Sequence, residues 1–216
     1  MSAAADVKLL HKGLRTWTQG LAQGGHPELR VEVSDASLLP ESEAYLHHVV
    51  NYLVTQHIAL RTGETLSYGY WLTKFLIADD RFLEVWEYNA DATTFVRGAT
   101  LTLTYWRDQH QLCERVQAQF LPPRQDKLVA ISPGVMEGDP VEAVRYPSPE
   151  HMSGWWITTD RYDGNVHSLR TEHLYHVTAA RPELARYLAL PHGFRVDLRN
   201  GERVWFDQEV AKQPVE

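Results

Sequence analysis

The segment at residues 194–206, FRVDLRNGERVWF, constrains the fold most strongly, because Asn-Gly between two apolar stretches is the strongest short-range signal for a β-hairpin. A type I′ turn at Asn200 and Gly201 places Arg199 opposite Glu202. In that register four side chains share one face, which we expect to be buried: Phe194, Val196, Leu198 and Trp205. The sequence therefore predicts a terminal antiparallel hairpin.

A long amphipathic helix is predicted at residues 42–61, SEAYLHHVVNYLVTQHIALR. Ser42 is expected to cap this helix, and Gly63 to mark its end. The spacing of three and four residues that defines its buried face runs through Leu46, Val50, Leu53, His57 and Leu60, with Tyr45 and Val49 alongside.

The next stretch mixes strand and helix signals. Residues 65–89 are rich in aromatic and branched side chains and are interrupted at ADD, which predicts two strands in a hairpin. A second helix is predicted from Asp91 to about Val116, although the LTLTY segment inside it could instead form a strand.

The second half reads as short strands separated by Gly and Pro, followed by a short helix at residues 181–190 with Pro182 in its first turn. We expect Leu184, Leu188 and Tyr187 to face inward from this helix. The stretch FLPPRQDK, residues 120–127, marks a boundary, so the predicted regions are 1–125 and 126–216. The stretch is short for a free linker, which allows the two regions to pack as one globule. The expected class is α+β: helices with antiparallel strands, then a small mixed sheet with one short helix.

Composition excludes several classes of function. The 28 acidic residues outnumber the 21 Lys and Arg residues, giving a net charge of -7 without a basic cluster, so nucleic-acid binding is not expected. The single cysteine, Cys113, predicts a buried thiol in a reducing compartment. The first twenty residues lack the apolar core of a secretory signal, and no window has the ~20 apolar residues that span a bilayer, so we expect a cytoplasmic protein.

Catalytic motifs are not matched. Ser153 lies in HMSGW, which lacks the first glycine of the esterase G-x-S-x-G elbow, so we expect Gly154 to allow a close turn in ordinary core. Phosphate-binding loops of the Walker or Rossmann type are absent. Carboxylates that could be imagined as a glycosidase pair are expected to be mainly solvated surface: Glu137, Asp139, Glu142, Asp160 and Asp163.

The eleven histidines raise the question of a metal site. His173 and His176 could share a helix face, but the segment RTEHLYHVT is predicted to be extended or a loop, which would separate the two rings. His47, His48 and His57 share the first helix without forming an H-E-x-x-H motif. We therefore expect neither a metal nor any other cofactor.

Aromatic residues are the remaining positive feature, with 7 Trp and 10 Tyr. Such side chains dominate cores and also serve as interface anchors. Trp155 and Trp156 are adjacent, so in an extended segment they point to opposite faces and one of them can be exposed. The others considered are expected in the core: Trp71, Trp86, Trp106 and Trp205.

From residue 127 to about residue 208, the order of features resembles a bacterial toxin-immunity family, immunity protein family thirty-three. The resemblance is carried by LVAISPGVMEGDPVEAVRYPSPEHMSGWW, then RPELARYLALPHG, then the terminal hairpin. The matching positions are Ser132, Gly138, Val141, Arg145, Ser153, Gly154, Trp155, Pro182, Leu188, Pro191 and Gly193. Family members often continue after the tryptophan with a Gly-Asp-Glu turn, whereas this chain has WITTDRYDGN and keeps only Asp160 and Asp163.

The resemblance implies a cytoplasmic, non-catalytic immunity protein that binds a cognate toxin. Ser153, Gly154, Trp155, Pro191 and Gly193 are expected to be structural. The candidate toxin-binding residues are Trp156, Asp160, Arg161, Tyr162 and Asp163. Two alternatives remain open: a scaffold or regulatory module that binds other proteins, and a small hydrolase using Ser153 with a histidine from TEHLYH.

Overall fold

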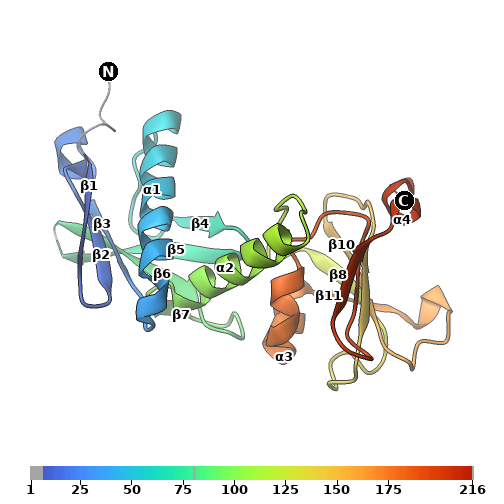
Figure 1. Cartoon of the computed structure of the whole chain (residues 1–216). Coiled ribbons are helices and arrows are strands. Elements are labelled where there is room, and N and C mark those ends of the chain that lie inside the picture. The colour runs from blue at the N-terminus through green and yellow to red at the C-terminus, as the bar shows by residue number, and fades with distance from the viewer. Residues whose placement is uncertain (1–6, 80, 216) are drawn as a thin grey trace. The chain divides into compact units, whose positions relative to one another are not determined.

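The computed structural model describes residues 7–79 and 81–215. The chain divides into two compact units: unit 1 comprises the chain up to Asn89 and Thr93–Arg107, and unit 2 comprises Ala90–Ala92 and the chain from Asp108 onward. Both units combine helices with a sheet (Figure 1), so the predicted α+β class is confirmed. The stretch 120–127, predicted as a boundary, lies within unit 2.

Unit 1 is built on a seven-stranded mixed sheet in the order β1-β2-β3-β6-β5-β4, with β7 beside β6. β3 and β6 run parallel, and the other neighbouring pairs are antiparallel. The strands are β1 (Lys8–Lys12), β2 (Arg15–Gln19), β3 (Glu28–Glu32), β4 (Thr65–Tyr68), β5 (Trp71–Asp79), β6 (Phe82–Tyr88) and β7 (Phe95–Arg97). Two short 3-10 helices precede β3 and the first long helix: η1 (Leu21–Gly24) and η2 (Ala36–Leu38).

The 65–89 region contains three strands rather than the two predicted. Gly69, with φ of 61°, allows a tight turn between β4 and β5, and the continuous aromatic run YGYW concealed that turn. The predicted break at ADD agrees with the end of β5 and the start of β6, although Asp80 lies outside the described residues.

The first long helix, α1 (Leu39–Gln56), begins three residues before its predicted start and ends earlier than predicted. Pro40 occupies the first turn, and Ser42 is not the cap, because its hydroxyl donates to the Leu39 carbonyl from within the helix. His57 has φ of 53° and closes the helix in the left-handed conformation, so neither His57 nor Leu60 belongs to the helical face.

The second long helix, α2 (Thr100–Arg115), starts nine residues after the predicted Asp91, and its LTLTY segment is helical. Residues 95–97 pair with β6 instead, and Gly98, with φ of 104°, turns the chain toward the helix. The α2 amides of Leu101 and Thr102 donate to the carboxylate of Glu87. This capping carboxylate lies in β6 rather than in the residues directly before the helix. Burial raises the pKa of this carboxyl group.

The core of unit 1 lies between one sheet face and the two long helices, with α1 crossing the strands (Figure 1). Its members include Leu29, Val31, Leu46, Val49, Leu53, Phe75, Leu83, Val85 and Leu103. Among the tryptophans expected in cores, Trp71 is fully buried, and Trp86 and Trp106 are half-buried. Trp205, in unit 2, is exposed, so that expectation was wrong.

Unit 2 contains a six-stranded sheet in the order β11-β8-β10-β9-β12-β13, in which β8 and β10 are parallel. The strands are β8 (Leu128–Ile131), β9 (Glu142–Arg145), β10 (Met152–Thr158), β11 (Arg170–His173), β12 (Phe194–Asp197) and β13 (Arg203–Phe206). The helical segments are η3 (Val166–Ser168), α3 (Leu174–Ala180), η4 (Pro182–Tyr187) and α4 (Gln208–Ala211).

The short helix predicted at residues 181–190 is present as the 3-10 helix η4, with Pro182 in its first turn. Leu184, Tyr187 and Leu188 are buried, as predicted. Cys113 is also buried, and burial raises the pKa of its thiol to about 11. The thiol is therefore protonated near neutral pH.

The terminal hairpin forms, but its register differs from the predicted one. Asp197 pairs with Arg203 and Arg195 pairs with Trp205, so Arg199 does not lie opposite Glu202. A one-residue slip moves a side chain to the other face, which places Trp205 away from Phe194 and Val196. The Asp197 carboxylate accepts from the Arg199 amide and from the Arg203 guanidinium, and these bonds stabilise a wider loop than a two-residue turn.

Candidate functional site

The Ser-Gly-Trp segment lies in β10, and Ser153 is part of the core of unit 2. Its side chain is buried, and its hydroxyl donates to the Leu128 carbonyl at 2.8 Å. A buried hydroxyl held in this way cannot reach a substrate. The geometry therefore supports the structural interpretation of Ser153.

Gly154 lies within β10 rather than in the close turn that was predicted, and it allows the strand to approach the chain at Tyr146 closely. Its φ is 80°, and an added Cβ would lie 2.2 Å from the Tyr146 carbonyl oxygen. The pairing of β10 with β8 is irregular between Met152 and Trp156, so β10 bulges at this glycine.

A buried arginine holds the loops beneath this bulge. Arg145 donates to the carbonyl of Ser153 through Nε at 3.1 Å. Its Nη1 donates to three further carbonyls, those of Leu121, Leu188 and Leu190. The Trp155 indole N–H donates to the same Leu188 carbonyl at 3.1 Å. Burial lowers the pKa of Arg145 to about 10, so the guanidinium remains charged at neutral pH.

Trp156 lies on the opposite face from Trp155, as predicted. Trp155 is fully buried, whereas Trp156 is half-buried and lines a surface pocket of about 370 Å³. Its ring meets Tyr146 edge-on, with centroids 5.6 Å apart. The other lining residues are Pro147, Ser148, Pro149, His151, Met152, Gly154, Gln213 and Pro214.

The strand register extends this surface across the sheet. Trp156 pairs with Val144, Val144 with Arg195, and Arg195 with Trp205. The adjacent row on the same face pairs Glu142 with Asp197, and Asp197 with Arg203. We call these two rows the outer face of unit 2. The predicted hairpin register placed Trp205 in the core, so neither Trp205 nor Arg195 was expected on this face. The alternation of apolar and polar residues in FRVD is the signal that could have identified Arg195.

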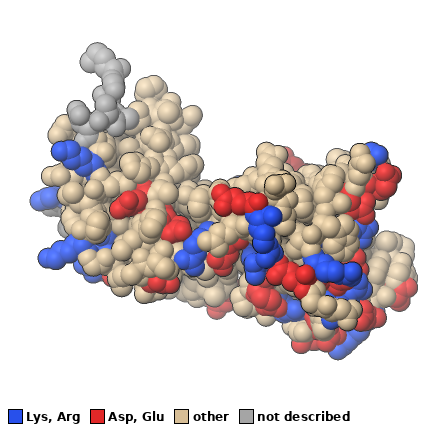
Figure 2. Space-filling model, in the orientation of Figure 1, with Lys and Arg blue, Asp and Glu red and all other residues tan. Residues whose placement is uncertain are grey.

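Ion pairs connect the outer face with the loop after β10. Arg199 pairs with Asp197 at 3.0 Å, with Glu142 at 2.9 Å and with Asp160 at 3.5 Å. The side chain of Asp160 is 82% exposed, so this predicted binding residue is accessible beside the network. Figure 2 shows acidic and basic side chains gathered next to one another on unit 2. A charged rim beside half-buried aromatic residues is typical of protein interfaces.

The other predicted binding residues lie in the same loop. Arg161 is exposed and pairs with Asp139 at 2.7 Å, and the backbone amide of Tyr162 donates to the Thr159 carbonyl. Asp163 accepts from the Asn165 amide and the Ser168 hydroxyl, and these bonds lower the pKa of its carboxyl group. The structure thus brings the five predicted residues to one loop and its strand, and it gives Asp163 a role in holding the loop.

Acidification is expected to weaken unit 2 through Asp197. Hydrogen bonds from Arg199 and Arg203 to this almost fully buried side chain lower its pKa in the folded state. A carboxylate of this kind stabilises the fold above its unfolded-state pKa of about 3.9, and the contribution is lost as pH falls further. Asp197→Asn should therefore reduce the free energy of unfolding at pH 7. The difference in this free energy between the variant and the unsubstituted chain should become smaller as the pH falls from about 4 to about 2.

Urea denaturation across that pH range measures this effect, and Asp126→Asn, at an exposed position in the same unit, is the matched control. A difference between the Asp197 variant and the unsubstituted chain that stays constant with pH would contradict the assignment.

The histidine pair differs from its prediction. His173 ends β11 and His176 lies in α3, and their rings are 5.9 Å apart rather than separated. The helix begins at Leu174, which places the two rings one turn apart. His176 contacts the Glu172 carboxylate at 3.2 Å, and His173 contacts the Asp126 carbonyl at 2.9 Å. Within residues 7–79 and 81–215, no group of three or more His, Cys, Asp or Glu side chains is placed to hold a metal ion.

Comparison with protein families finds a match within unit 2. Residues 108–207 match the family model described as the Imm33-like domain, in agreement with the resemblance to immunity protein family thirty-three. No curated protein and no solved structure matches the chain. In the part of the chain that the structure describes, no helix is long and apolar enough to cross a bilayer.

Proposed function

Because residues 108–207 form an Imm33-like domain, we propose that this protein is an immunity protein that binds a cognate bacterial toxin and neutralises it without chemistry of its own. The toxin is delivered by contact or secretion, and the protein acts in the cytoplasm of its producer. Binding occludes the toxin's active site or holds the toxin in an inactive conformation. The family match is the observation that carries this proposal.

The outer face of unit 2 and the loop that follows β10 are the proposed toxin-binding surface. Trp156 offers a half-buried aromatic side chain beside a pocket, and Asp160 offers an exposed carboxylate close to it in the chain. Tight protein complexes depend on a few such aromatic and charged anchors surrounded by weaker contacts. The net charge of -7 favours rapid association with a basic toxin.

Co-expression tests the proposal directly. The protein is expressed together with the toxin-like C-terminal domain encoded beside its gene, and growth rescue and then co-purification are measured. Rescue with a stable complex supports neutralisation by binding. An active toxin domain that is neither bound nor neutralised would contradict the proposal, and it would favour a scaffold or regulatory module that uses both units to bind other partners.

Trp156→Ala is expected to weaken toxin binding by about 30-fold or more, the effect of losing an interface anchor of ~2 kcal/mol. The melting temperature should change by only about 2 °C, because the side chain is half-buried and lies on the face away from the core. Isothermal titration and thermal unfolding measure the two effects separately. Tyr52→Ala, an exposed aromatic substitution in unit 1, is the control and should leave the affinity unchanged.

The acidic residues are tested with the double variant Asp160→Ala and Asp163→Asn. Asparagine retains an oxygen that can accept from the Asn165 amide, so the loop is kept while charge is removed. We expect a slower association rate at low salt and a weaker dependence of that rate on salt concentration than for the unsubstituted chain, as measured by stopped-flow mixing. Equal losses of binding and of thermal stability would instead assign these residues to the fold.

A further inference from the structure

Unit 1 carries a second surface that takes no part in the proposed toxin site. One face of its sheet buries Leu29, Val31 and Leu83 in the core with the helices. Because side chains alternate along a strand, Arg30 and Glu84 project from the other face. The register continues this row, since Trp17 pairs with Arg30 and Arg30 pairs with Glu84. We call this second surface the open face of unit 1.

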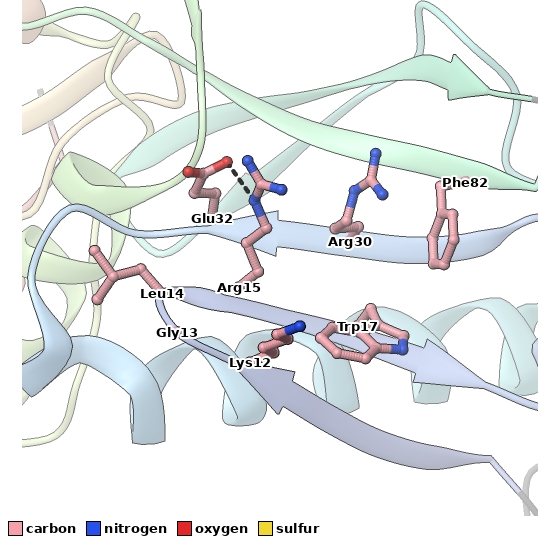
Figure 3. Close-up of a pocket in the computed structure, with 8 residues that line it drawn as sticks. All are labelled: Lys12, Gly13, Leu14, Arg15, Trp17, Arg30, Glu32 and Phe82. Atoms are coloured by element: carbon pink, nitrogen blue, oxygen red, sulfur yellow. Dashed lines mark hydrogen bonds and ion pairs between the residues drawn. The ribbon is translucent and has the colours of Figure 1, made fainter.

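A pocket of about 730 Å³ lies on the open face, within the range of ligand-binding sites in proteins. Figure 3 shows its side chains projecting from neighbouring strands, with the Trp17 and Phe82 rings on β2 and β6 and the Arg30 side chain on β3. The complete lining is Lys12, Gly13, Leu14, Arg15, Trp17, Arg30, Glu32 and Phe82.

Charged side chains lie against the apolar part of the pocket. The Arg30 guanidinium lies 4.6 Å from the centroid of the Phe82 ring. The same guanidinium pairs at 2.7 Å with Glu84, whose side chain is only 9% exposed. Leu14, at the tip of the β1–β2 hairpin, is 38% exposed. The pocket therefore presents ordered apolar surface to solvent, suited to an apolar side chain.

The charge around the pocket is opposite to that of the whole chain. Lys12, Arg15 and Arg30 line it against one carboxylate, that of Glu32, which pairs with Arg15 at 3.0 Å. Three cations and one carboxylate leave an excess of two positive charges among the lining residues, whereas the chain carries a net charge of -7. A ligand that bears carboxylates is complementary to this pocket.

We propose that the pocket on the open face of unit 1 binds an acidic peptide segment of a partner protein. An apolar side chain of the segment packs against Trp17 and Phe82, and its carboxylates pair with Lys12, Arg15 and Arg30. This interaction is separate from the toxin binding proposed for unit 2, because no residue of the outer face contributes to it.

A peptide fits these observations better than a nucleic acid does. Sequence-independent binding of single strands needs a continuous track of cations beside stacking rings. Here Glu32 and Glu84 pair with Arg15 and Arg30 and interrupt the row of cations, so the pocket offers only a local group of positive charges rather than a continuous track. Strand addition is also disfavoured, because β1, at the edge of the sheet, carries Lys8 and Lys12. The contacts are therefore made by side chains.

A random-peptide display library selected on the full chain tests the proposal. We expect enriched sequences that combine Asp or Glu residues with one large apolar residue. A synthetic peptide of the enriched sequence should bind the double variant Lys12→Glu and Arg15→Glu at least about 10-fold more weakly than it binds the unsubstituted chain. The reason is that the variant replaces attraction between opposite charges by repulsion between like charges. The control, Lys8→Glu with Lys212→Glu, makes the same change of charge outside the pocket and should alter the affinity less than 2-fold, roughly the effect of distant screened charges.

Leu14→Ser is a second variant at an exposed turn position, so it reports on the pocket even if the charge reversals disturb folding. Circular dichroism checks the fold of each variant. Three results would overturn the proposal: enrichment without acidic residues, equal binding by the pocket variants and the unsubstituted chain, or tighter binding of a thymidine oligonucleotide than of any selected peptide. Toxin rescue by the pocket variants is scored separately, so failure of either proposal is distinguishable from failure of the other.

Discussion

Gly154→Ala is expected to lower the free energy of unfolding of unit 2 by about 3–4 kcal/mol. Two costs combine at this position. A left-handed backbone with φ of 80° disfavours any residue with a Cβ, and the new methyl group would lie 2.2 Å from the Tyr146 carbonyl oxygen. The bulge in β10 must then open, or β9 must move. Urea denaturation gives the size of the loss, and hydrogen exchange of peptides from residues 128–158 assigns it to unit 2.

Gly164→Ala separates the two costs. Gly164 has almost the same φ, 79°, but its Cβ would meet nothing within 4 Å. This control should lose only the conformational part, about 1–2 kcal/mol. Equal losses in the two alanine variants would mean that the close approach to Tyr146 does not contribute to stability.

Arg145→Met is the second substitution with a large expected effect, a loss of about 3 kcal/mol or more. Methionine fills much of the same volume but donates no hydrogen bond, so the carbonyls of Ser153, Leu121, Leu188 and Leu190 each lose a donor. Relief from burying a charge offsets part of this loss. It does not offset all of it, because the four acceptors remain in a largely buried environment.

Thermal unfolding and urea denaturation measure the Arg145 effect, and Arg124→Met is the matched control. Arg124 is exposed and pairs with Asp126, so its replacement should change the free energy of unfolding by less than about 0.5 kcal/mol. Arg145→Lys tests the geometry, since lysine keeps the charge but cannot present the guanidinium fork. Full stability of the lysine variant would show that charge alone is sufficient.

The sequence predicted the elements better than it predicted their boundaries, and long-range contacts explain the difference. The start of α2 depends on the Glu87 carboxylate, which accepts from the Leu101 and Thr102 amides across fourteen and fifteen residues. Local patterns of side chains contain no information about such a partner. The helix was therefore predicted to start at Asp91, because aspartate is a favoured N-cap residue.

The hairpin illustrates the same point at the candidate site. Asn-Gly predicted the turn, but the bonds from Arg199 and Arg203 to Asp197 set a register one residue away. Simple alternation was sufficient for Trp155 and Trp156, because both follow the bulge and pair with β9 in an unbroken register. It failed for Trp205, whose face depends on the register, and so the sequence did not place Trp205 in the same row of the outer face as Trp156.

Arg145, Trp155 and Ser153 have one property in common: each donates to a main-chain carbonyl rather than to a side chain. Every amino acid carries that acceptor. Substitutions at Leu121, Leu128 or Leu190 therefore leave the bonds chemically possible, provided that the backbone keeps its path. A scaffold held together in this way tolerates changes in the side chains at these positions over evolutionary time without losing the hydrogen bonds that hold its segments in place.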